Sequence, residues 1–110
     1  MESGYIRVAD TSEIPIGTTK KVIVQSQEIL VANVNGTYYA IGNVCTHQRG
    51  DLSQSKLEGN VVICPKHKSR FDVTTGKMVS GPKMGLFHPK IADEPAYVVK
   101  TENTDILIKL

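Results

Sequence analysis

The feature that most limits the fold of this chain is the length of its apolar runs, which are short and rich in Val, Ile and Tyr. Gly, Pro, Asn and Asp separate these runs, and no long stretch repeats apolar residues with the 3.6-residue period of a helix. The pattern predicts an all-β protein. A chain of 110 residues is the size of one domain, in which a buried cavity for a bulky organic substrate is not expected.

The outer parts of the chain contain the longer runs. Asn35-Gly36 is the favoured two-residue hairpin turn, and residues 102–105 supply a second turn. The strands predicted around these turns are 21–25, 28–34, 37–41, 97–101 and 106–110. Together they predict a sheet scaffold. Between Gly42 and Pro89 the runs shorten to 61–63, 71–73 and 78–79, which predicts loops and short strands mounted on that scaffold.

Charge and composition exclude several classes of function. The formal net charge of +2, with no Trp and 5% aromatic residues, argues against nucleic acid as a partner. No stretch approaches the roughly 18 apolar residues of a membrane span, and the N-terminus resembles no signal peptide. We therefore predict a cytoplasmic protein with no membrane span. Two cysteines are too few for a disulfide framework, so another use for the thiols is favoured.

Both cysteines are paired with a histidine at very short spacing. The sequence reads Cys45-Thr46-His47 and, sixteen residues later, Cys64-Pro65-Lys66-His67. A thiolate is an anionic donor that stabilises ferric iron, whereas a neutral imidazole donates less and carries no charge. Replacing two Cys by two His in a two-iron cluster raises its potential from around −400 mV into a band of roughly −150 to +300 mV. The spacing predicts that two facing loops bring the four side chains together.

These residues resemble the Rieske family, whose pattern is C-x-H followed after a loop by C-x-x-H. The resemblance extends over Cys64–Asp72, Thr75-Gly76, Gly81-Pro82 and Leu86–Pro89. Taken with the β pattern, it covers nearly the whole chain. It implies a [2Fe-2S] cluster bound by Cys45, His47, Cys64 and His67. It also implies an antiparallel β-sandwich or incomplete barrel as the base, at about 1–42 and 88–110, and a cluster-binding part at about 43–87.

Further residues are assigned by the same resemblance. Ser69 matches a serine that donates to a bridging sulfide, and Phe71 stands where high-potential members have a tyrosine that donates to a cysteine sulfur. Pro82 lies in the loop that covers the cluster in the family. Gly50 and Lys66 stand near where membrane-complex members have two further, disulfide-bonded cysteines. The chain therefore resembles a soluble, disulfide-free Rieske-type ferredoxin, with the archaeal sulredoxins as a candidate subgroup.

The predicted function is that of a one-electron carrier, not an enzyme. Redox proteins such as a reductase or an oxygenase are the expected partners, and they would dock near His47 and His67. A basic group at Lys66, Lys68 and Arg70 is either a solvated loop or a docking patch for an acidic partner. Two alternatives are an electron-transfer subunit bound permanently to an oxygenase or reductase and a structural zinc module, although zinc ligand pairs are usually spaced more widely than Cys45-x-His47.

Overall fold

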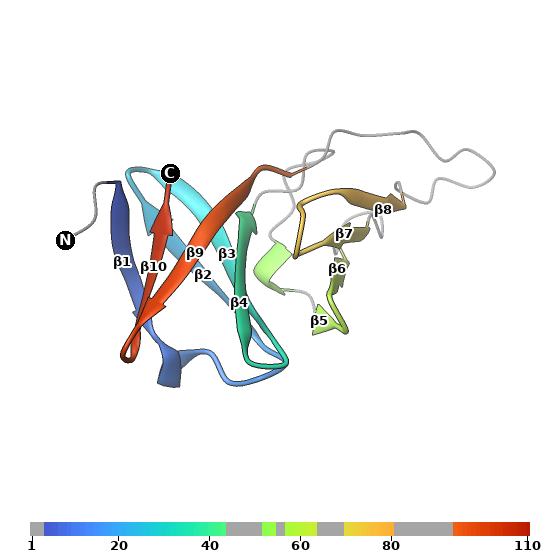
Figure 1. Cartoon of the computed structure of the whole chain (residues 1–110). Coiled ribbons are helices and arrows are strands. Elements are labelled where there is room, and N and C mark those ends of the chain that lie inside the picture. The colour runs from blue at the N-terminus through green and yellow to red at the C-terminus, as the bar shows by residue number, and fades with distance from the viewer. Residues whose placement is uncertain (1–3, 44–51, 55–56, 64–69, 81–93) are drawn as a thin grey trace.

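The computed structural model describes residues 4–43, 52–54, 57–63, 70–80 and 94–110 (Figure 1). The described part contains β-strands and two short 3-10 helices, and none of its helices is long and apolar enough to cross a membrane. In chain order the elements are β1 (Tyr5–Asp10), η1 (Thr11–Glu13), β2 (Thr19–Val24), β3 (Gln27–Val34), β4 (Thr37–Gly42), η2 (Leu52–Gln54), β5 (Leu57–Glu58), β6 (Val61–Ile63), β7 (Arg70–Asp72), β8 (Met78–Ser80), β9 (Ala96–Glu102) and β10 (Asp105–Lys109).

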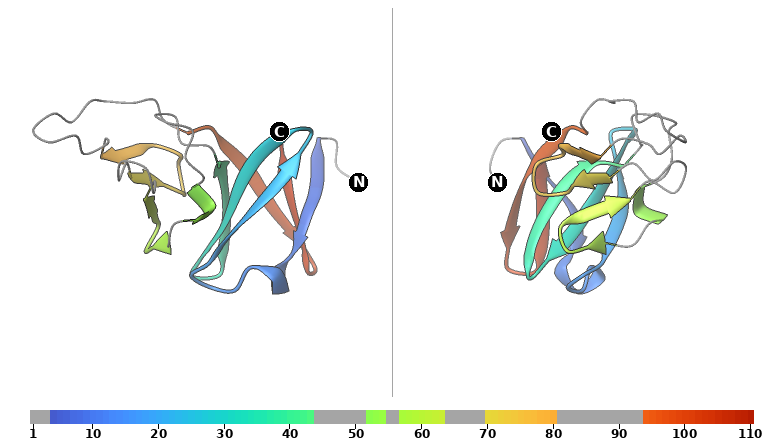
Figure 2. Two further views of the ribbon diagram at one scale, coloured as in Figure 1. Left: turned by 180° about the vertical axis from the view of Figure 1, so that it is seen from behind. Right: turned by 90° about the vertical axis from the view of Figure 1, so that its right-hand side faces the viewer.

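The strands form two antiparallel sheets. The larger has the order β1-β10-β9-β4-β3-β2, and the smaller has the order β5-β6-β7-β8. Figures 1 and 2 show the six-stranded sheet curled into an open barrel, with the four-stranded sheet beside β3 and β4. We call the six-stranded sheet the base and the four-stranded sheet the small sheet. The arrangement confirms the predicted all-β class, with an incomplete barrel and a smaller part made of short strands.

Turn residues fix the central hairpin of the base. Asn35 and Gly36 both have positive φ angles, 54° and 94°. A two-residue hairpin turn needs such angles to match the twist of the flanking strands. The Asn33 side chain supports this turn, because its Oδ1 accepts from the Gly36 N–H at 2.8 Å while its Nδ2 donates to the Ile14 carbonyl at 2.8 Å. The predicted β3–β4 hairpin is therefore confirmed.

The connection after β1 is held by a capping box on η1. The Asp10 side chain accepts from the Ser12 N–H at 2.9 Å, and the Glu13 carboxylate accepts from the Asp10 N–H at 2.8 Å. Lys20 forms an ion pair with Glu13. The hydrogen bonds from Ser12 lower the pKa of Asp10, and the hydrogen bond from Lys20 is the main cause of the lowered pKa of Glu13.

Two buried clusters share the β3–β4 layer. The first fills the barrel with Ala9, Ile14, Val22, Val24, Ile29, Val31, Ala40, Ile106 and Ile108. The second lies under the small sheet and contains Leu30, Ala32, Ile41, Leu52, Val62, Phe71 and Val73. Successive side chains of a strand point to opposite faces, so Ile29 and Val31 enter the first cluster while Leu30 and Ala32 enter the second. The continuous apolar run in β3 is thus explained by burial on both faces.

Four elements of the structure were not predicted from the sequence: β1, β5 and both 3-10 helices. In β1 the pairing with β10 shifts between Arg7 and Ala9, so a bulge breaks the alternation by which a strand is recognised. β5 has two residues, too few to show a pattern. The middle of the chain was predicted as loops with three short pieces, and the structure pairs these pieces with β5 into one small sheet.

Candidate metal centre

The predicted ligands lie in two segments that the structure leaves undescribed. Cys45 and His47 fall within 44–51, Cys64 and His67 fall within 64–69, and Ser69 lies in the second of these segments. Pro82 lies outside the described residues as well, in 81–93. Phe71 is described. The structure therefore bears on the site through the residues at which these segments begin and end.

Hydrogen bonds to Asn43 join the two ends of the first ligand segment. Its carbonyl accepts from the Leu52 N–H at 2.9 Å, and its side-chain Oδ1 accepts from the Ser53 N–H at 2.9 Å. The Asn43 N–H donates to the Glu28 carbonyl at 3.0 Å, which ties this closure to β3. Asn43 is fully buried. The residues on either side of segment 44–51 are consequently tied to each other and to the base.

The second ligand segment connects two paired strands. Ile63 and Arg70, the residues on either side of 64–69, are partners in the antiparallel β6–β7 register, and Val62 pairs with Phe71 one step further from the loop. A hydrogen bond of 2.8 Å from the Val73 N–H to the Asn60 carbonyl closes the other end of the hairpin. The C-x-x-H motif therefore lies in the segment that joins two paired antiparallel strands.

The ends of both ligand loops are packed into the second cluster. Leu52, which follows the first loop, and Val62 and Phe71, which flank the second, are each 0% exposed. One packed unit thus supports both loops, as the facing-loop prediction requires. Two thiolates and two imidazoles, brought by such loops, are a donor set that suits a cluster with one sulfur-ligated and one nitrogen-ligated iron. The described ranges themselves offer no group of three or more His, Cys, Asp and Glu that could hold a metal.

The third undescribed segment, 81–93, ends at a junction of the two sheets. The Glu94 N–H donates to the Gly76 carbonyl at 2.7 Å, between β7 and β8, and the Gly42 N–H donates to the Pro95 carbonyl at 2.9 Å, at the end of β4. Glu94 is 5% exposed and is the buried ionisable residue of the described part. Sequence reasoning missed both Glu94 and Asn43, because a single Glu or Asn beside a turn is usually solvated and no pattern marks it as buried.

The surface next to the second loop carries part of the predicted basic group. Arg70 and Lys77 are both exposed, on β7 and on the turn that leads into β8. Lys66, Lys68, Lys83 and Lys90 lie outside the described residues. The described part therefore places Arg70 beside segment 64–69, whereas Lys77 lies at the other end of β7, where its carbonyl accepts from the Asp72 N–H at 2.9 Å.

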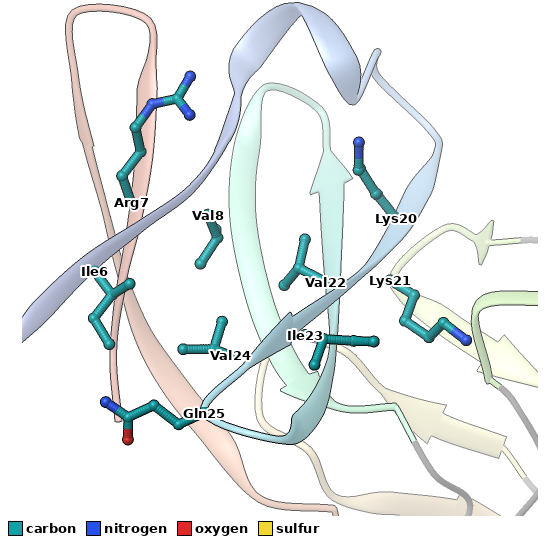
Figure 3. A pocket seen from close by; sticks show the side chains of 9 residues that line it. All are labelled: Ile6, Arg7, Val8, Lys20, Lys21, Val22, Ile23, Val24 and Gln25. Carbon is teal, nitrogen blue, oxygen red and sulfur yellow. The ribbon is translucent and has the colours of Figure 1, made fainter.

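A hollow of about 530 Å³ lies elsewhere, between the two edge strands of the base (Figure 3). Figure 3 shows Val8, Val22 and Val24 in the gap between β1 and β2, and Val22 and Val24 belong to the first cluster. Its lining contains no Cys or His. This hollow is an opening of the barrel and has no part in the metal centre.

Comparisons with known proteins agree with this arrangement. A model of the Rieske [2Fe-2S] domain matches residues 4–105. The chain is 37% identical over 110 residues to the ferredoxin component of the naphthalene 1,2-dioxygenase/salicylate 5-hydroxylase systems of a Ralstonia species, covering 100% of this chain and 99% of the relative. It is 36% identical over 106 residues to the ferredoxin component of the naphthalene 1,2-dioxygenase system of Pseudomonas putida, covering 96% and 95% of the two chains.

A solved structure is similar over the same extent. The ferredoxin of carbazole 1,9a-dioxygenase from Nocardioides aromaticivorans IC177 matches with a TM-score of 0.83 at 29% identity, covering 97% of this chain and 98% of that one. These similarities favour the iron–sulfur hypothesis over a structural zinc module.

Proposed function

This chain belongs to the Rieske [2Fe-2S] domain family, and from that premise we propose that it is the ferredoxin component of an oxygenase system. It holds a [2Fe-2S] cluster and transfers electrons, and the relatives that support this are ferredoxin components rather than the catalytic subunits. The partner proposed for this chain is the terminal oxygenase of a system that hydroxylates an aromatic compound. The observation that carries the proposal is similarity over essentially the full length of two such components. The sulredoxin subgroup stays a prediction.

The proposed ligands are Cys45 and Cys64 on one iron and His47 and His67 on the other. The fixed ends of both loops support this assignment, because Leu52, Val62 and Phe71 pack in one buried cluster. When bound, the cluster supplies a one-electron acceptor, whose potential the neutral imidazoles raise relative to an all-cysteine cluster. The residues proposed to surround the cluster are Ser69, Phe71 and Pro82.

The proposed docking surface surrounds His47 and His67. Arg70 is exposed where the second ligand segment ends, and a cation in this position would attract an acidic surface on a partner and speed encounter at low salt. We further propose a soluble protein of the cytoplasm, with the base at about 1–42 and 88–110 and the cluster-binding part at about 43–87. The separate pairing of β5–β8 supports this division.

Stopped-flow mixing tests the carrier role. The reduced protein is mixed anaerobically with the oxidised Rieske-type terminal oxygenase of an aromatic dioxygenase system, and the spectra of both proteins are followed. Electron transfer within seconds, slowed by added salt, is expected. Arg70→Glu should slow the second-order phase severalfold, whereas Lys109→Glu, an exposed charge reversal at the end of β10, should not. Absence of transfer to any such oxygenase while the cluster reduces and reoxidises normally would contradict the proposed role.

A further inference from the structure

The end of segment 81–93 is built around a buried carboxylate. Glu94 is 5% exposed, although a Glu is almost never buried unless its surroundings compensate for the loss of water. Two glycines make room for it. A methyl group added to Gly42 would lie 2.5 Å from Glu94 Oε1 and 3.1 Å from the Pro95 ring, and one added to Gly76 would collide with the Glu94 carbonyl oxygen. The close packing fixes both the backbone and the side chain of Glu94.

This carboxylate lies close to the first ligand loop. Gly42, against which Oε1 packs, immediately precedes Asn43, and Asn43 closes that loop through its bonds to Leu52 and Ser53. Cys45 is three residues after Gly42, and three residues of extended chain reach at most about 11 Å. The covalent chain alone therefore keeps Cys45 near the Glu94 carboxylate, whatever the shape of the loop.

A second observation indicates that the carboxylate exerts a field. The pKa of Tyr97 is raised, first by burial of the ring and then by the negative charge of Glu94. The charge is poorly screened because the side chain is buried. A fixed negative charge near a redox centre opposes the addition of an electron, since reduction makes that centre more negative.

We propose that Glu94 is a positioning and potential-setting residue, which joins the end of segment 81–93 to both sheets and holds the reduction potential of the cluster low. The proposal rests on the proposed metal centre. For any two unit charges about 15 Å apart, an effective dielectric constant of about 20 gives an interaction that changes the reduced-to-oxidised ratio by about fivefold to tenfold. Tenfold corresponds to about 59 mV for one electron.

Glu94→Gln tests the charge, because it keeps the volume of the side chain and removes the negative charge. The reduced-to-oxidised ratio at a given applied potential should rise about fivefold. Voltammetry of the cluster-loaded protein should therefore show a reduction potential about 40 mV higher. Glu94→Asp, which keeps the charge, should stay near the original potential. Glu28→Gln is the matched control: the Glu28 carbonyl also contacts Asn43, but its side chain is 42% exposed, so solvent should screen its effect.

Gly42→Ala tests the positioning. The added methyl group would collide with the carboxylate, so the variant should lose the cluster to a chelator severalfold faster, and Glu94→Ala in the same protein should partly restore retention. The electrostatic part of the proposal would be overturned if Glu94→Gln shifted the reduction potential no more than Glu28→Gln does, with the cluster absorbance unchanged. The positioning part would be overturned if the Gly42→Ala single variant and the Gly42→Ala/Glu94→Ala double variant lost the cluster to the chelator at the same rate. Neither outcome touches the proposed function, which would fail if the unmodified protein bound no cluster or passed no electrons to an oxygenase.

In the protein without cluster, Glu94→Gln should also lower the pKa of Tyr97 toward its ordinary value, as followed by NMR of the tyrosine ring. An unchanged Tyr97 titration would show that Glu94 exerts no field there and would count against the electrostatic part.

Discussion

The base and the small sheet bury their apolar side chains by different means. Strands of the base have five to eight residues, and every member of the first cluster comes from the base or its connections. Strands of the small sheet have two or three residues. Their cluster is completed by Leu30, Ala32 and Ile41 from β3 and β4. A sheet this small needs an additional packed surface to be stable, so the part that carries the ligand loops depends on the base for its core.

The dependence of the small sheet on the base for its core indicates why the chain combines the two sheets. The base combines local hairpins, β2–β3–β4 and β9–β10, with two pairings between strands distant in sequence, β1–β10 and β4–β9. The small sheet holds both ends of the second ligand segment, 64–69, and it does so with few residues. A change in the base should therefore affect both parts, whereas a change confined to the small sheet should affect mainly the ligand loops.

The largest effect is expected from Phe71→Ala, which removes a fully buried ring from the second cluster. Such a truncation lowers the free energy of unfolding by about 3 to 5 kcal/mol. We expect it to lower the hydrogen-exchange protection of the amides in β6 and β7, while the amides in β10 keep theirs. Ile106→Ala, in the first cluster, costs about 2 to 5 kcal/mol and should lower protection in both sheets. An equal loss in β7 and β10 for Phe71→Ala would show that the two parts unfold together.

How much of this comparison could be predicted from sequence depends on the residues involved. Asn35-Gly36 marks the β3–β4 hairpin because both positive φ values suit these residue types. The run Ile29–Ala32 predicts a strand, but only the second cluster shows which residues face the small sheet. The bulge between Arg7 and Ala9 conceals β1, since it interrupts the period-2 pattern.

The site shows the same division. Cys45, His47, Cys64 and His67 are predicted by residue type and spacing, and they stay a prediction because they lie outside the described residues. Asn43 and Glu94 were not predicted. Each acts through partners distant in sequence: Asn43 bonds Glu28 and Ser53, and Glu94 packs against Gly42 and Gly76. No local pattern encodes contacts of that kind.

An intermediate effect is expected from two buried asparagines, Asn43 at the start of the first ligand segment and Asn33 beside the β3–β4 turn. Asn43→Ala removes the acceptor of the Ser53 N–H, and Asn33→Ala removes the groups that bind Gly36 and Ile14. Leaving a buried polar group unsatisfied costs about 1 to 3 kcal/mol, so both should lower the melting temperature. Only Asn43→Ala should speed the loss of cluster to a chelator. Equally fast loss from Asn33→Ala would contradict a specific role of Asn43 in the first ligand loop.

A smaller effect is expected from Phe71→Tyr, which sharpens the account of the second cluster. If the ring edge reaches a cysteine sulfur, as the family resemblance implies, the added hydroxyl should raise the reduction potential by about 59 mV, the equivalent of tenfold in the redox equilibrium. Stability should then change little. A lower melting temperature with a potential shifted by less than about 15 mV would instead show that Phe71 serves packing alone. Voltammetry and thermal melting of one sample separate the two.

The smallest effect concerns the capping box of the base. The folded-state pKa values of Asp10 and Glu13 lie below their ordinary values of 3.8 and 4.5, so both carboxylates stabilise the fold above these values. That stabilisation should be lost as the pH falls through the lower folded-state values. Asp10→Asn should therefore lower the melting temperature slightly at pH 7 and less at pH 3, measured by circular dichroism. An unchanged difference between the two pH values would contradict this assignment.

The most direct test of the central claim is the iron, acid-labile sulfide and zinc content of the purified protein, expressed with ample iron. A Rieske-type carrier should contain about two irons and two sulfides per chain and should absorb visible light. Cys45→Ser and Cys64→Ser should each abolish stable assembly of the cluster. Zinc without sulfide in the unmodified protein, or full iron and sulfide in either serine variant, would contradict the metal centre described above.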